Sequence, residues 1–199
     1  MDTEKIRKPL RRADKDYSAI GAYFLTVCTK EKEKLLWDMQ RYNPKTIADD
    51  YAKAVGAMTH RPQCLCPLNH YGKIVESAVL DIPNHYPFVT LDHFVVMPNH
   101  VHILLSITDT AEERGRWVIA PTGSVVDSTA DGGRKTMQKD PSVSQIVRQF
   151  KTAVSRAIGN SIWQRSFYDR IVRNPKEYEL IAKYIRENPL FWMHDENYI

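Results

Sequence analysis

The sequence predicts an α+β fold in which helices pack against an antiparallel β-sheet. Two segments, 88–97 and 100–107, are rich in β-branched and aromatic residues. They are separated by Pro98 and Asn99, a turn signal that predicts a β-hairpin. Segments with helical spacing of apolar residues stand before and after this hairpin. Hairpin-joined strands with interleaved helices indicate an α+β sandwich.

The first half of the chain supplies one strand and one clear helix ahead of the hairpin. Residues 19–29 are rich in β-branched and aromatic side chains and predict a strand. A short helix is expected near 46–57. Ile74, Val75, Ala78 and Val79 have helical spacing, and the helix that they predict ends at Pro83.

The second half adds two helices around a short extended segment. An amphipathic helix is predicted over 142–158, with Ser142 as its N-cap and Gly159 as its stop. Residues 161–172 predict a strand or extended turn. A last helix follows Asn174, the expected N-cap, and closes at Pro189.

Length and composition bound the kind of protein. A chain of 199 residues favours one domain, here 1–199, with a basic arm over 1–17 and a long surface loop over 109–140. Three cysteines fit a reducing cytoplasm better than a disulfide framework. No apolar run approaches the ~18 residues needed to cross a bilayer. With no apolar leader at the N-terminus, we expect a cytoplasmic protein that is not a membrane protein.

Positive charge is concentrated in the C-terminal part of the chain. The formal charge is +4, but residues 142–186 contain nine basic and three acidic side chains and carry +6. A second basic cluster occupies 5–15. Such clusters are typical of proteins that bind polyanions, although solvated helix faces are an equally weighted alternative.

Two histidines lie one residue apart in the second hairpin strand. Residues two apart in a strand point to the same side, so His100 and His102 present their imidazoles together and can chelate one divalent ion. The alternative is two satisfied polar residues on a solvated sheet face. The apolar flanks predict a buried strand, where unpartnered imidazoles are costly, and this favours the metal site.

The same run resembles the start of a histidine-triad nucleotide hydrolase. In that family a nucleophilic histidine would follow two residues after His102, but position 104 is leucine. The nucleophile of that chemistry is therefore missing. A metal that acts on phosphate would also need a third ligand from elsewhere in the chain.

The last predicted helix carries a candidate nucleophile and a candidate ligand. Tyr184 and Asn188 are four residues apart and therefore share one helix face. A tyrosine can form covalent intermediates, and an asparagine oxygen suits Mg²⁺ or Mn²⁺. Taken alone, Tyr184 fits a core or surface aromatic residue better than a nucleophile, and Asn188 fits a C-cap before Pro189.

Three segments taken together resemble one known family. VVMPNHVHILL, SIWQRSFYDRIVRN and YIRENP occur in the order and approximate spacing of the single-tyrosine HUH transposases, where HUH stands for His, hydrophobic residue, His. The sequence is most similar to the branch of REP-associated tyrosine transposases. The resemblance covers most of 17–197, except 38–70 and 109–140.

This resemblance implies a fold and a reaction. The family fold is a ferredoxin-like or RRM-like antiparallel sheet with helices packed on it and a C-terminal helix that carries the tyrosine. By residue, His100 and His102 would hold Mg²⁺ or Mn²⁺, Asn188 would be a third ligand or orient the metal, and Tyr184 would be the nucleophile. The implied activity is cleavage and rejoining of single-stranded DNA at hairpin or palindromic ends through a 5′-phosphotyrosine intermediate.

The resemblance also implies partners. The expected partner is single-stranded or hairpin DNA, which would place the protein at the nucleoid, and relatives that share active sites make a homodimer a further expectation. The candidate DNA-binding residues are Arg148, Lys151, Arg165, Tyr168 and Arg170. Trp163, Phe167 and Tyr168 are candidates for stacking on unpaired bases, with core packing as the alternative.

Other readings stay open. His60, Cys64, Cys66 and His70 are zinc-type ligands, although the Cys-x-Cys spacing is tighter than in common zinc knuckles. The chain could instead be a non-catalytic binder of hairpin nucleic acid with the same fold. A third hypothesis is a metal phosphodiesterase in which water replaces Tyr184 as the nucleophile.

Overall fold

Four strands form one antiparallel sheet in the computed structural model, which describes residues 20–56, 66–108 and 142–198. The strands are β1 (Gly21–Cys28), β2 (Val89–Val96), β3 (His100–Ile107) and β4 (Tyr168–Val172). The helices are η1 (Lys30–Lys32), α1 (Pro44–Gly56), α2 (His70–Leu80), α3 (Ile82–His85), α4 (Val143–Ile158), α5 (Pro175–Glu187) and η3 (Asn188–His194).

The connectivity is that of a ferredoxin-like fold. The strand order is β2-β3-β1-β4, α2 stands between β1 and β2 in the chain, and α4 stands between β3 and β4. This is the β-α-β-β-α-β arrangement. The predicted α+β fold is therefore confirmed, including the hairpin of β2 and β3 and a C-terminal helix that carries Tyr184.

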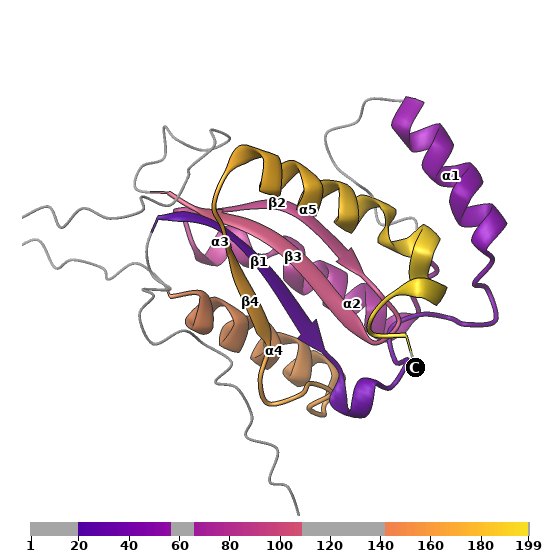
Figure 1. The fold of residues 1–199 in the computed structure, drawn as a ribbon. Coiled ribbons are helices and arrows are strands. Elements are labelled where there is room, and N and C mark those ends of the chain that lie inside the picture. The colour runs from indigo at the N-terminus through magenta and orange to yellow at the C-terminus, as the bar shows by residue number, and fades with distance from the viewer. Residues whose placement is uncertain (1–19, 57–65, 109–141, 199) are drawn as a thin grey trace, which may run out of the picture.

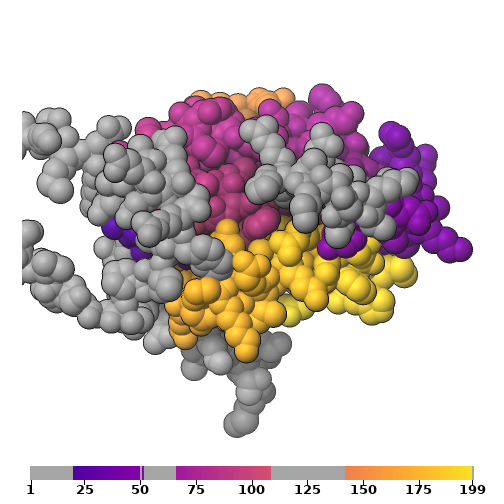
Figure 2. Space-filling model, turned by 90° about the horizontal axis from the view of Figure 1, so that it is seen from above, coloured from indigo at the N-terminus to yellow at the C-terminus, as the bar shows by residue number. Residues whose placement is uncertain are grey.

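Helices cover both faces of the sheet (Figure 1). α5 crosses one face, and α2 and α4 lie together on the other. The space-filling view shows α5 and η3 as a continuous surface, with α1 beside the yellow C-terminal end (Figure 2). Because β3 is paired on both edges and covered on both faces, all eight of its residues are buried.

The predicted helix caps are present. The Ser142 side chain accepts a hydrogen bond from Gln145 N–H, and the Gln145 side chain accepts one from Ser142 N–H. Gly159 ends α4 with φ 86°. The Asn174 side chain caps α5 by accepting a hydrogen bond from Glu177 N–H. These caps fix where α4 and α5 begin, and thereby which of their side chains face the sheet.

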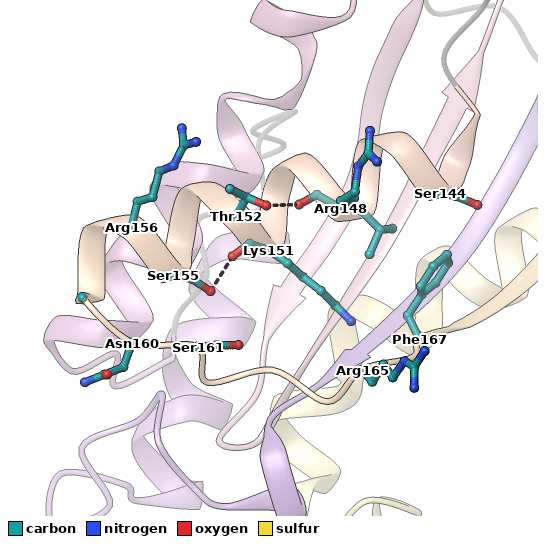
Figure 3. Close-up of a pocket in the computed structure, with 12 residues that line it drawn as sticks. Ser144, Arg148, Lys151, Thr152, Ser155, Arg156, Asn160, Ser161, Arg165 and Phe167 are labelled. Atoms are coloured by element: carbon teal, nitrogen blue, oxygen red, sulfur yellow. Dashed lines mark hydrogen bonds between the residues drawn. The ribbon is translucent and has the colours of Figure 1, made fainter.

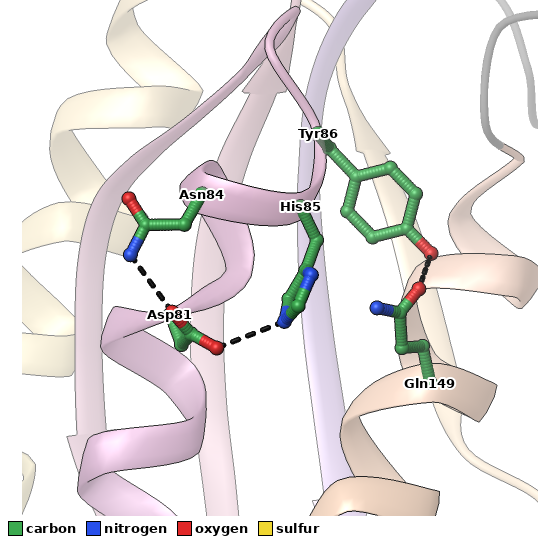
Figure 4. Close-up of polar contacts among 5 residues, drawn as sticks. All are labelled: Asp81, Asn84, His85, Tyr86 and Gln149. Carbon is green, nitrogen blue, oxygen red and sulfur yellow. Dashed lines mark hydrogen bonds and ion pairs between the residues drawn. The ribbon is translucent and has the colours of Figure 1, made fainter.

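The proline predictions need correction. α2 ends at Leu80, and Pro83 lies inside the separate short helix α3 rather than ending α2. The turn is fixed at Asp81, which accepts hydrogen bonds from Asn84 (2.8 Å) and pairs with His85 (2.8 Å) (Figure 4). Tyr86 then joins this turn to α4 by donating to Gln149 Oε1 at 2.5 Å. Pro189 does end α5, but a 3-10 helix continues the chain.

Several predictions concern residues outside the described ranges. The arm 1–17 and the loop 109–140 are among them, so both stay predictions, as does the assignment of the whole of 1–199 to one domain. In the described ranges, no helix combines the length and apolarity needed to span a membrane.

Candidate active site

The candidate site lies where α5 crosses the first half of β3. β3 supplies His100 and His102, α5 supplies Tyr184, and Asp195 follows η3. Alternation along β3 puts both histidines on the face that α5 covers, while Val101 points into the α2 and α4 side. Strand pairing and helix packing thus bring together residues that are far apart in the sequence.

The two imidazoles point their Nε2 atoms at each other. His100 Nε2 and His102 Nε2 lie 3.0 Å apart, and the side chains are 0% and 2% exposed. Burial lowers the pKa of His100 to about 4, and burial followed by the neighbouring His100 lowers the pKa of His102. Both rings are therefore neutral at pH 7, which is the form that binds metal ions.

The other nitrogen of each ring has a fixed partner. His100 Nδ1 lies 2.8 Å from Asn99 Oδ1, and His102 Nδ1 lies 2.9 Å from Thr26 Oγ1. Phe24 stacks on the His102 ring with centroids 5.2 Å apart. Such contacts hold a ligating ring in one orientation.

The Tyr184 hydroxyl meets this pair from α5. Its Oη lies 3.2 Å from His102 Nε2 and 3.1 Å from Asp195 Oδ2, to which it donates. The side chain is 41% exposed, so the hydroxyl is reachable from solvent while held at the histidines. Burial and then the negative charge of Asp195 raise the pKa of Tyr184. The phenol is therefore protonated at neutral pH and has an acceptor in place.

Asn188 and Asp195 form the remaining side of the site. Asn188 is 4% exposed, and its Nδ2 donates to Asp195 Oδ2 at 2.8 Å, while its Oδ1 is buried without a hydrogen-bond partner. Burial opposes ionisation of Asp195, but hydrogen bonds from Asn188 and Asn197 N–H outweigh it and lower the pKa of Asp195. Asp195 is thus an anion at neutral pH.

Sequence reasoning missed Asp195. It follows Tyr184 by eleven positions, but α5 ends at Glu187, so no continuous helix puts the two residues on one face. The usable signal was an acidic residue in a short segment after Pro189, where the chain cannot continue α5 as an α-helix. The 3-10 helix η3 turns the chain back and delivers this carboxylate to the site.

These residues fit a metal ion. His100, His102 and Asp195 each offer one ligand atom, and the three atoms lie within 4.8 Å of one another. Two imidazole nitrogens with a carboxylate oxygen are a donor set that divalent ions accept. Within the described residues, this is the one group of three histidine, cysteine or acidic side chains with that geometry.

The predicted DNA-binding residues divide between the two faces of the sheet. Arg148 and Arg165 are exposed and line an open groove of about 780 Å³ beside α4, together with Arg156, Asn160 and Phe167. Lys151 extends from α4 toward the segment that carries Arg165, whereas Arg148 and Arg156 extend away from it (Figure 3). The groove thus has basic side chains on both of its walls.

Lys151 also forms hydrogen bonds that stabilise the fold. Its Nζ donates to the carbonyl oxygens of Gln164 (2.8 Å) and Ser166 (2.9 Å). Burial lowers the pKa of Lys151 to about 8. The side chain therefore ties the segment before β4 to α4, in addition to lining the groove.

Tyr168 and Arg170 lie on the site face of edge strand β4. Tyr168 pairs across the strands with Thr26 and is 54% exposed, while Arg170 pairs with Phe24 and forms an ion pair with Glu177. Trp163 is 3% exposed and packs on Phe150, so core packing is its role. Tyr168 stays a candidate for stacking on bases.

The zinc hypothesis is not tested by the described residues. His60 and Cys64 lie outside them, while Cys66 is half-buried and His70 begins α2. This hypothesis therefore stays a prediction.

Comparison with known proteins gives one sequence relative and a structural neighbour. No family model matches the chain. An uncharacterized protein of Haemophilus influenzae is 29% identical over 198 residues, which cover 97% of this chain and 93% of that protein. A solved structure of a REP-associated tyrosine transposase bound to a REP hairpin aligns with a TM-score of 0.50 and 19% identity, over 95% of this chain and 76% of that one. The chain thus shares the α+β fold of that transposase.

Proposed function

We propose that this protein is a single-tyrosine HUH transposase that cleaves and rejoins single-stranded DNA at hairpin ends. The observation that carries the proposal is the position of Tyr184 Oη, 3.2 Å from His102 Nε2. A tyrosine placed beside a pair of neutral, converging imidazoles is arranged for covalent attack at a metal-bound phosphate. The nucleophile comes from the same chain as the histidines.

His100, His102 and Asp195 would hold the divalent ion, with Mg²⁺ or Mn²⁺ as the expected metal. When bound, the ion would neutralise charge on the scissile phosphate. Asn188 orients Asp195 through its amide nitrogen, and its unpartnered Oδ1 is a further oxygen donor at the site. This assignment keeps Asn188 as a metal-orienting residue and adds Asp195 as the third ligand.

Tyr184 carries the covalent step. Its Oη attacks phosphorus, the bond from phosphorus to the 3′ oxygen breaks, and the products are a 5′-phosphotyrosine and a free 3′-hydroxyl. The phenol already donates to Asp195 Oδ2, which is placed to take the proton, and water supplies a proton to the leaving oxygen. Attack by another 3′-hydroxyl reverses the reaction and rejoins strands.

The groove beside α4 would bind the hairpin backbone. Its basic residues are Arg148, Lys151, Arg156 and Arg165, and none of the described residues that line it is acidic. The structural neighbour named above is bound to a REP hairpin. Tyr168 and Arg170 lie on the site face of β4, where they would contact the unpaired strand.

The test is capture of the covalent intermediate. Single-stranded oligonucleotides from palindromic repeats that flank the gene are incubated with protein and Mn²⁺, and adducts that resist SDS are mapped by mass spectrometry. We expect an adduct at Tyr184, none with Tyr184→Phe, and a normal adduct with the control Tyr71→Phe, an exposed tyrosine on α2 that lies outside the site and the groove. Cleavage by Tyr184→Phe would instead support a water-using phosphodiesterase. Hairpin binding by the wild-type protein without cleavage would support a non-catalytic binder.

A further inference from the structure

Asn99 connects the first histidine to three other parts of the chain. It is the last residue of the turn before β3 and is 0% exposed. Its backbone oxygen accepts hydrogen bonds from Thr29 N–H (2.9 Å) and from the Thr29 hydroxyl (3.0 Å). Its amide nitrogen donates to the backbone oxygens of Lys32 (3.1 Å) and Asn197 (2.8 Å).

These contacts decide which way the Asn99 amide points. Backbone carbonyl oxygens only accept hydrogen bonds, so the side-chain atom that faces Lys32 and Asn197 must be the nitrogen. The oxygen of the amide then faces His100 Nδ1 at 2.8 Å. Because that oxygen has lone pairs and no hydrogen, His100 Nδ1 must carry the hydrogen. His100 Nε2 is left with a free lone pair directed at His102.

We infer that Asn99 is a positioning residue that fixes His100 in the tautomer able to bind a metal through Nε2. The inference rests on the proposed function for the metal, but the tautomer follows from hydrogen bonding alone. Through Asn197, the same amide ties His100 to the segment that carries Asp195. Two of the three candidate ligands therefore share one buried support.

Thr26 holds the second histidine differently. A hydroxyl can donate or accept, so Thr26 does not by itself select a tautomer for His102. Of the two Nδ1 contacts, the one with Asn99 is therefore the one that fixes a tautomer.

The test measures imidazole tautomers by ¹⁵N NMR on the full-length, metal-free protein. His100 signals are assigned by their loss in His100→Gln. We expect wild-type His100 in the Nδ1–H form and a shift toward Nε2–H in Asn99→Ala, which removes the acceptor oxygen. Asn69→Ala is the matched control. The Asn69 side chain also donates to two backbone oxygens and caps a helix, but its Oδ1 accepts from Gly72 N–H instead of facing an imidazole.

A second readout is the affinity for Mn²⁺ alone, measured by titration calorimetry. We expect Asn99→Ala to weaken Mn²⁺ binding by about 10- to 100-fold, and Asn69→Ala to change it less than about twofold. Equal weakening by both variants, or wild-type His100 in the Nε2–H form, would overturn the inference. A wild-type protein with the expected tautomer but no Mn²⁺ binding would instead overturn the proposed function. The wild-type spectrum decides the tautomer even where a variant fails to fold.

Discussion

The hydroxyl of Tyr184 and Nε2 of His102 lie 3.2 Å apart although their residues are separated by 82 positions in the chain. The sheet and α5 are responsible, because His102 stands in the central strand β3 and α5 packs across that strand. Phe24 supports both partners: it stacks on His102 and meets the Tyr184 ring edge-on at 6.1 Å. The packing of α5 on β1 and β3 therefore sets the position of the hydroxyl, although the Tyr184 side chain is partly exposed.

Metal binding and DNA binding should separate genetically. We expect His100→Ala to abolish cleavage while hairpin affinity stays nearly unchanged, because affinity comes mainly from phosphate contacts by Lys and Arg. Cleavage in Mn²⁺ and gel-shift titration on the same hairpin measure the two effects. Loss of hairpin binding by His100→Ala would show that the histidines have a structural role.

Removing the charge of Asp195 should weaken the metal site without disturbing the fold. Asp195→Asn keeps the size of the side chain, and we expect Mn²⁺ affinity and cleavage to fall by about 10- to 100-fold. The neighbouring exposed Glu196 provides a control, since Glu196→Gln changes net charge equally. If both variants lost the same activity, the effect would be general electrostatics rather than ligation.

The groove beside α4 should determine the salt dependence of binding. Arg148→Ala and Arg165→Ala should each weaken hairpin affinity and reduce the slope of log K against log salt by about 1, because each removes about one phosphate contact. Arg41→Ala, an exposed arginine outside the groove, should leave the slope unchanged. Titrations at two or more salt concentrations measure this. An unchanged slope in both groove variants would place the hairpin elsewhere.

Stability should depend on pH through Asp92. Burial raises the pKa of Asp92 to about 6, against the hydrogen bond from the Ser106 hydroxyl at 2.6 Å. Because the folded pKa lies above the unfolded value, stability falls as pH rises from about 4 to 6 and is constant above that range. Asp92→Asn removes this penalty, so it should be more stable than the wild type at pH 7.5, by about 1–2 kcal/mol, and no more stable near pH 4.

Urea unfolding at pH 4 and 7.5 measures this difference, and Asp81→Asn is the control of opposite sign. The hydrogen bond from Asn84 is the largest influence on the pKa of Asp81 and lowers it. The contribution of the ionised Asp81 to stability is therefore present at neutral pH and is lost as the pH falls through the pKa of Asp81 in the folded protein. A stability of Asp92→Asn that follows the wild type at both pH values would contradict the assignment.

Local sequence patterns predicted the strands and helices that position the site. Alternation placed His100 and His102 on one face, and the caps Ser142 and Asn174 fixed the starts of α4 and α5. These features depend on neighbours within a few residues, so the sequence displays them directly. The ferredoxin-like strand order came from the family resemblance rather than from residue patterns.

Contacts between residues that are far apart in the sequence were not predictable in this way. Asp195 reaches the site because η3 folds back after Pro189, and α5, which carries Tyr184, ends before it. Asn99 was identified only as a turn residue, although its amide bonds Lys32 and Asn197, which are 67 and 98 positions away. Lys151 was predicted as a phosphate contact, while its two carbonyl bonds are visible only in three dimensions.

Because β3 is buried, its amide hydrogens are expected to exchange with solvent at a different rate from those in the other parts of the site. Amide groups in a strand that is paired on both edges and covered on both faces exchange with solvent only when the whole domain opens. The segment after α5 is anchored by the fully buried Trp192, and beyond it by one hydrogen bond from Asn99 to Asn197 O and one from Asn188 to Asp195. We therefore expect the amides that follow Trp192 to exchange faster than those of β3, so that Asp195 is the candidate ligand most often exposed by local opening.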